Sequence, residues 1–207
     1  YKKLLYWQQP NKWLPLIAEL AQFLTWAKRE CKPQKFIVQK RIAYGHALSM
    51  LDNLFGDKAE YIITVRHPGA IAESFKELED IDMEKIREPF GWKALAKSEK
   101  KLNKKMWDDL TYNERALIYW EIYYKDIVKY GLPKGNANIL GYGKEEYETF
   151  LKKFAQRNNK AYNPDEFQIA KREYDDFWYS EQVNEVVNQV NLWWQIHGFD
   201  FPELELK

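Results

Sequence analysis

The stretch YIITVRHPGAIAESF, residues 61–75, constrains the fold more than any other part of the chain. Its first five residues, Tyr61 to Val65, are apolar and largely β-branched, which predicts a short strand buried on both faces. Pro68 suits the first turn of a helix, because its missing N–H would have no helical partner there. Arg66 therefore lies between a strand and a helix, where open α/β sheets bind their ligands.

Strands and helices are expected to alternate along the rest of the chain. The helices indicated by apolar periodicity and capping residues cover 11–30, 43–55, the segment starting at 68, 111–130, 144–155 and 180–197. The other strand candidates are 35–39 and 136–142. This order predicts an α/β fold with a parallel sheet flanked by helices. No repeat or linker is evident, so a single domain over 1–207 is expected.

Helix boundaries are marked most clearly around the segment 111–131. Thr111 and Glu114 form a capping box at its start, and Gly131 is suited to its end. The run IYWEIYY at 118–124 has aromatic residues at helical spacing. Packing between helices is the favoured interpretation of these aromatics, and stacking on a sugar or phenol ring is the alternative.

The charge balance and the cysteine count exclude several classes of protein. Thirty-two basic residues against 31 acidic ones do not support a nucleic-acid-binding surface. Cys31 is the only cysteine, which excludes an internal disulfide and a cysteine-built zinc site and fits a reducing compartment such as the cytoplasm. No apolar run approaches the length of a membrane span, and no metal site is expected. Residues 78–110 are rich in charge, which favours solvated helices or a flap over a site.

Arg66 and Ser74 together suggest an anion site. The first turn of a helix attracts negative charge through its free N–H groups and its dipole. The guanidinium of Arg66 adds a planar fork that matches phosphate oxygens. The side chain of Ser74 leans toward the helix N-terminus and could reach the same anion. The alternative is that Arg66 pairs with a glutamate and Ser74 bonds to its own helix backbone.

The motif VRHPGAIAESF resembles the signature of the sulfotransferase superfamily: a strand, Arg, one residue, Pro, and Ser eight positions after the Arg. In that family the Arg and the Ser bind the 3′-phosphate of 3′-phosphoadenosine 5′-phosphosulfate (PAPS). The resemblance extends to the segments KFIVQKRIAYGHALSMLDNLFGDKAEYIITVRHP, LIYWEIYYKDIVKYG, NILGYGKEEYETFLKKFA and LWWQIHGFD. It implies a P-loop-like fold, PAPS as co-substrate, and Arg66 and Ser74 as its ligands. A small-molecule or glycan acceptor would receive the sulfuryl group on a hydroxyl or amine.

The chain also departs from the family pattern. The Ser/Thr/Gly-rich loop that holds the 5′-phosphosulfate is not found, and neither is the RKG cluster of cytosolic animal members. We expect the loop to lie upstream of Tyr1, so that the chain is an N-terminally truncated piece of a sulfotransferase. One alternative is a non-catalytic nucleotide-binding or interaction module of the same fold. A P-loop kinase relative is a third hypothesis, and it would require a different upstream loop.

Sulfuryl transfer would need a base for the acceptor and a cation for the leaving phosphate. Lys40, at the end of the strand candidate 35–39, matches the family's lysine and is the candidate cation. A solvated lysine is the alternative. His67, beside Arg66, is the first candidate for the base, ahead of His46 and of carboxylates such as Glu73.

Overall fold

The computed structural model describes residues 48–77, 100, 102–129, 131–133, 135–143, 145–163 and 174–204, together with 18, 21–25 and 29. Contacts divide the chain into two compact units, 1–47 and 48–207, and the single domain stays a prediction. In the first unit the described residues are helical, as expected for 11–30, and Thr25 donates a hydrogen bond to the carbonyl of Ala21 at 2.8 Å. The strand candidate 35–39, Lys40 and His46 lie outside the described residues.

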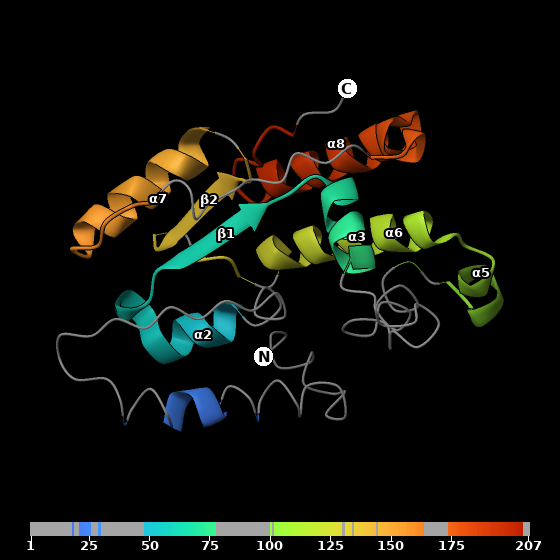
Figure 1. Ribbon diagram of the computed structural model, residues 1–207. Helices are drawn as coiled ribbons and strands as arrows, with labels where there is room; N and C mark the ends of the chain where they lie inside the picture. The colour runs from blue at the N-terminus through green and yellow to red at the C-terminus, as the bar shows by residue number, and fades with distance from the viewer. Residues whose placement is uncertain are drawn as a thin grey trace. The chain divides into compact units, whose positions relative to one another are not determined.

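The second unit contains a sheet of two parallel strands, β1 (Tyr61–Val65) and β2 (Ala137–Gly141), as Figure 1 shows. Tyr61 pairs with Ala137 and Val65 with Gly141. Both strands match their predicted positions to within one residue at each end. The mixture of a parallel sheet with mostly helices confirms the α/β class.

Strand β1 has one buried face, so the prediction of burial on both faces is wrong. Tyr61 and Val65 are buried, whereas Ile62 and Thr64 are exposed. Successive side chains of a strand point to opposite sides of the sheet. The side of β1 that carries Tyr61 and Val65 is therefore covered, and the side that carries Ile62 and Thr64 is exposed.

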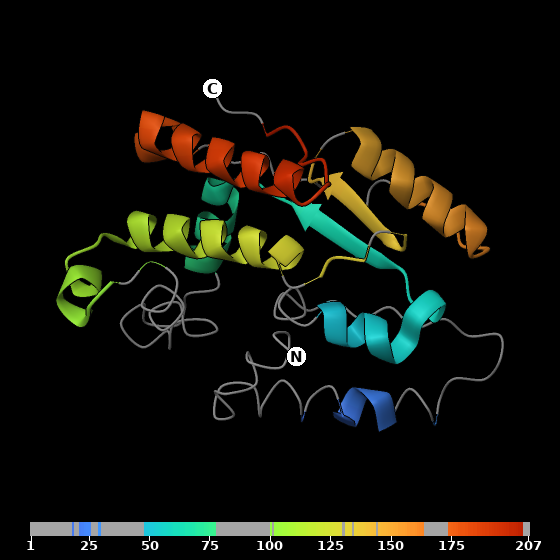
Figure 2. The same cartoon turned by 180° about the vertical axis from the view of Figure 1, so that it is seen from behind.

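The helices are α2 (Leu48–Phe55), α3 (Pro68–Glu77), α5 (Lys104–Asp108), α6 (Tyr112–Lys129), α7 (Glu145–Arg157) and α8 (Glu181–Ile196), with short 3₁₀ turns η3 (Gly56–Lys58) and η5 (Asp176–Tyr179). Helix α6 contacts both α3 and α8, and α7 lies along β2, as both views show (Figures 1 and 2). None of the helices within the described ranges is long and apolar enough to cross a membrane.

The predicted helix boundaries are confirmed where local signals were strong. Helix α3 begins at Pro68. Before α6, the Glu114 carboxylate accepts from the Thr111 N–H at 2.7 Å, and the Thr111 hydroxyl accepts from the Glu114 N–H at 3.3 Å. Gly131 has a φ of 107°, which side chains disfavour, and it follows the end of α6. In α2, Leu48 and Leu51 are buried and Leu54 is exposed, so the inner face continues to Phe55.

The core between α6 and α8 is aromatic, which confirms the packing interpretation of the run 118–124. Trp120, Tyr124 and Trp194 are buried, and the ring of Phe201 lies edge-on to all three. The Trp194 Nε1 donates to the carbonyl of Tyr124 at 2.8 Å. These contacts hold α6 against α8.

Candidate functional site

Arg66 and Tyr142 meet at the carboxyl end of the sheet. They directly follow Val65 and Gly141, which are partners in the parallel register. The Tyr142 N–H donates to the Val65 carbonyl at 2.7 Å and extends the pairing beyond the strands. The Arg66 guanidinium carbon lies 4.3 Å from the centre of the Tyr142 ring. A guanidinium on an aromatic face is attracted by the ring quadrupole, and the stack limits how the Arg66 fork can move.

Helix α6 fixes the backbone of Arg66 from behind. The Trp120 Nε1 donates to the Arg66 carbonyl at 2.9 Å, and the Arg66 N–H donates to the Tyr124 hydroxyl at 3.2 Å. The same hydroxyl donates to the carbonyl of Thr64 at 3.1 Å. Burial raises the pKa of Tyr124 to about 12, although the Arg66 N–H and the guanidinium lower it in part. The hydroxyl therefore stays protonated and can make both bonds.

The Arg66 guanidinium and the Ser74 hydroxyl have hydrogen-bonding capacity left over. Among the described residues, the guanidinium makes no ion pair, and its Nε is buried with no hydrogen-bond partner. Ser74 is half-buried on α3, and its hydroxyl makes no hydrogen bond within the same part of the chain. The glutamate partner and the bond to the helix backbone, which were the alternatives to an anion site, are both absent from the described residues.

His67 is buried between the sheet and α3, with 9 % of its surface exposed. Its Nδ1 accepts a hydrogen bond from the Gly69 N–H at 3.1 Å. The ring stacks on Tyr174, with the centroids 4.9 Å apart and the planes 9° from parallel. Its Nε2 is buried with no partner in the described part of the chain. Burial lowers the pKa of His67 to about 4, so the ring is neutral near pH 7.

Trp178 lies in η5, the segment that leads into α8, and packs against the first turn of α3. Its side chain is fully buried, and its Nε1 has no acceptor among the described residues. A Cβ added at Gly69 would lie 2.8 Å from Trp178 Cγ and 3.1 Å from Tyr174 Cγ. Gly69 is therefore required for the close approach of α3 to the segment 174–179.

The structure thus brings together three segments that are far apart in the sequence, namely residues 66–69, Tyr142 and residues 174–179. The place where they meet is called the corner below. Of the predicted site residues, it places Arg66 and His67 there, puts Ser74 farther along α3, and shows no hydrogen bond between Arg66 and Ser74 within the described ranges. The predicted roles of His67, Ser74 and Lys40 stay predictions. Reasoning from single residues missed Tyr142 and Trp178. For Tyr142 a signal was available, because it follows a strand at the same edge as Arg66.

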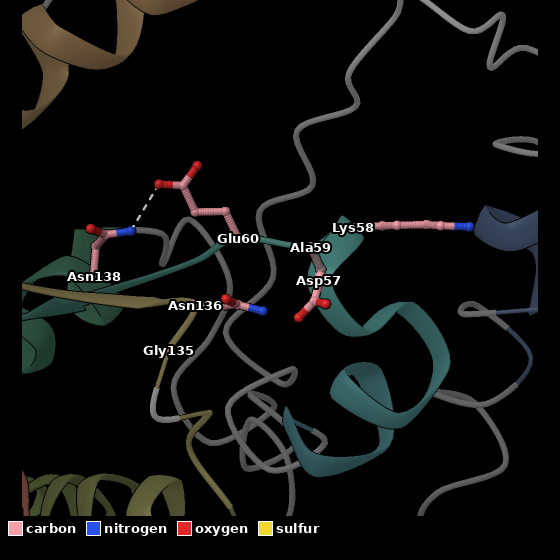
Figure 3. A pocket seen from close by; sticks show the side chains of 7 residues that line it. All are labelled: Asp57, Lys58, Ala59, Glu60, Gly135, Asn136 and Asn138. Carbon is pink, nitrogen blue, oxygen red and sulfur yellow. Dashed lines mark hydrogen bonds between the residues drawn. The ribbon is translucent and has the colours of Figure 1, made fainter.

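A hollow of about 410 Å³ lies at the opposite, amino end of the sheet, where segments 57–60 and 135–138 line it (Figure 3). One of its two carboxylates, Glu60, already binds Asn138 at 2.9 Å and Arg157 at 2.6 Å. Ligands of open α/β sheets bind at the carboxyl ends of the strands. We therefore place the candidate site at Arg66 and not in the hollow.

Within the described residues, no three His, Cys, Asp or Glu side chains gather as metal ligands do. Comparisons of the chain with protein-family models, with curated proteins and with solved structures found no match.

Proposed function

We propose that this chain is a sulfotransferase-like protein with a P-loop-like fold, which moves a sulfuryl group from PAPS to a hydroxyl or amine of a small-molecule or glycan acceptor. Arg66 and Ser74 would bind the 3′-phosphate of PAPS. The observation that carries the proposal is the guanidinium of Arg66 at the carboxyl end of β1, beside the first turn of α3, which makes no ion pair with any described residue. A charge-assisted hydrogen bond from this group is worth about 1.5–3 kcal/mol.

The surroundings of Arg66 favour an anion over other ligands. Among the described residues, the buried Nε of Arg66 has no hydrogen-bond partner, and a guanidinium can only donate hydrogen bonds. The backbone of Arg66 is fixed by Trp120 and Tyr124, so that little of its freedom remains to be lost on binding. A phosphate would supply acceptor oxygens to this guanidinium.

In the transfer step, the acceptor oxygen would attack sulfur, its proton would go to a base, and the bond from sulfur to the 5′-phosphate oxygen would break. The remaining nucleotide, 3′-phosphoadenosine 5′-phosphate (PAP), would leave with that electron pair. Lys40 would offset the charge that grows on the leaving phosphate. Arg66 and Ser74 would hold the nucleotide in place and take no part in bond making.

The test is the effect of PAP on unfolding. At about 100 times its dissociation constant, PAP should raise the free energy of unfolding by roughly 2.7 kcal/mol. Arg66→Ala should abolish this gain, and Arg66→Lys should restore only part of it, because lysine lacks the planar fork. Arg157→Ala is the matched control, because it removes an arginine from the other end of the sheet. Adenosine 5′-phosphate, which lacks the 3′-phosphate, should stabilise much less.

Two outcomes would contradict the proposal. One is a folded wild-type protein that PAP does not stabilise. The other is equal stabilisation of the wild type and Arg66→Ala. Sulfate transfer from PAPS would then be measured separately, because binding of PAP alone also fits a non-catalytic module.

A further inference from the structure

His67 performs the role of a helix N-cap. It directly precedes α3, and its Nδ1 accepts from the N–H of Gly69, the second residue of the helix. Its carbonyl accepts from the Ile71 N–H at 3.3 Å, as the carbonyl of an N-cap residue does. Asn, Asp and Ser usually fill this position, because a side-chain acceptor satisfies an N–H that has no helical partner. Here the imidazole supplies that acceptor.

The cap fixes the tautomer of the ring. A neutral imidazole has one acceptor nitrogen and one N–H. Because Nδ1 accepts from Gly69, the proton belongs on Nε2, which is buried. A ring in this state has no free lone pair for the proton of an acceptor hydroxyl. It could serve as a base only after the cap was broken.

The ring is also held on its faces. Tyr174 stacks on it at 4.9 Å, and Tyr179 lies at 6.3 Å with its ring tilted by 33°. The short distance between Gly69 and Trp178 leaves α3 little space to shift. The Gly69 bond, the Tyr174 stack and the Trp178 contact hold the first turn of α3 at a fixed position beside Arg66.

We propose that His67 is a positioning residue of the anion site and not the general base: by capping α3 through Nδ1, it fixes the corner from which Arg66 reaches its ligand. This inference rests on the proposed function for the identity of the ligand. It assigns the base to another group, one that can approach the acceptor with a free lone pair.

Two substitutions separate the roles of the two ring nitrogens. In Asn, Oδ1 occupies the position of Nδ1, so His67→Asn keeps the capping acceptor and removes Nε2. In Gln, the amide nitrogen takes the position of Nε2, so His67→Gln keeps a donor there and removes the cap. If His67 acts as a cap, His67→Asn should leave the dissociation constant of PAP within about threefold of the wild type. His67→Gln should raise it on the order of tenfold, the scale of a lost N-cap.

Nitrogen-15 NMR of the wild-type protein supplies a readout that does not depend on any variant. We expect His67 to show an unprotonated Nδ1 and a protonated Nε2 through the neutral pH range. A protonated Nδ1 would overturn the proposal. So would the reverse order of the variants, with His67→Gln binding PAP like the wild type and His67→Asn losing affinity, because Nε2 would then be the atom that matters.

Failure of the proposed function would look different. If the wild type does not bind PAP, the nucleotide is wrong. The tautomer, and a denaturation midpoint that His67→Asn keeps and His67→Gln lowers, would still report whether His67 caps α3.

Discussion

The charged side chains at the two ends of strand β1 are paired to different degrees. At the amino end, Glu60 is partly exposed and bonded to both Asn138 and Arg157. At the carboxyl end, Arg66 and His67 each hold a buried nitrogen without a partner among the described residues. A buried donor without an acceptor costs about 1–3 kcal/mol, so a folded protein keeps one where something else returns that energy. Tyr61, at the amino end, also has a buried hydroxyl without a hydrogen-bond partner in the described part of the chain. The difference between the ends therefore lies in Arg66, whose guanidinium points to the carboxyl end as the place for an anionic ligand, although the hollow lies at the other end.

The largest expected effect is a pH dependence of stability that comes from His67 at the carboxyl end. The pKa of His67 is lowered to about 4 in the folded protein, against 6.5 for an ordinary histidine. As the pH falls below 6.5, His67 takes up a proton in the unfolded chain, whereas in the folded chain it stays neutral until the pH approaches 4. The contribution of His67 is thus fully present above pH 6.5 and is lost as the pH approaches 4. The loss should reach about 3 kcal/mol.

Urea unfolding at several pH values measures this loss. The control is His67→Asn, which keeps a capping acceptor and cannot titrate, so its stability should fall less over the same range. Parallel curves for the two proteins would show that the imidazole is not buried in a neutral state.

The next effect compares one glycine at each end of the sheet. Gly69→Ala should lower the free energy of unfolding by about 1–2 kcal/mol, because the new methyl group would lie 2.8 Å from the buried ring of Trp178. Gly135→Ala, at the hollow, meets nothing within 4 Å and should leave stability unchanged or slightly higher. Neither glycine has a positive φ, so backbone strain does not enter. Thermal unfolding of both variants checks the difference, and equal effects would argue against the tight corner.

A smaller effect is expected at the hydroxyl that fixes Arg66. Tyr124→Phe removes the acceptor of the Arg66 N–H and the donor to the Thr64 carbonyl. The loss should be about 1 kcal/mol of stability, with weaker PAP binding. Tyr147→Phe is the control, because no hydrogen bond of its hydroxyl is found in the described part of the chain. Calorimetric titration with PAP would show whether the hydrogen bonds of the Tyr124 hydroxyl to the backbone contribute to PAP binding. Equal PAP affinity of Tyr124→Phe and Tyr147→Phe would show that they do not.

The smallest effect belongs to the amino end. Arg157→Ala breaks the ion pair between Arg157 and Glu60. The Arg157 side chain is 57 % exposed and the Glu60 side chain is 36 % exposed. Exposed pairs contribute about 0.2–1 kcal/mol and are weakened by salt. The variant should therefore lose less than about 1 kcal/mol, and the loss should shrink as salt is added to the unfolding experiment. A larger loss that salt does not change would mean that the amino end is as tightly constrained as the carboxyl end.

The sequence by itself determined the features that depend on neighbouring residues. The strand ends at Val65, α3 starts at Pro68, and Thr111 with Glu114 caps α6, because alternation, fixed dihedral angles and short-range hydrogen bonds are encoded within a few residues. Burial of β1 on both faces was predicted wrongly, since the covering of a face depends on distant elements.

Only the tertiary structure decided how the candidate site is built. The ring of Tyr142 reaches Arg66 because two distant strands pair in parallel with one register. The neutral state of His67 depends on burial against Tyr174, which comes from far along the chain. Contacts of this kind follow from the packing of whole elements, and no local pattern of residues carries them. The sequence could therefore identify Arg66 and His67 as candidate site residues. The fold decided their surroundings, namely the Tyr142 ring beside Arg66 and the Gly69 N–H and Tyr174 ring beside His67.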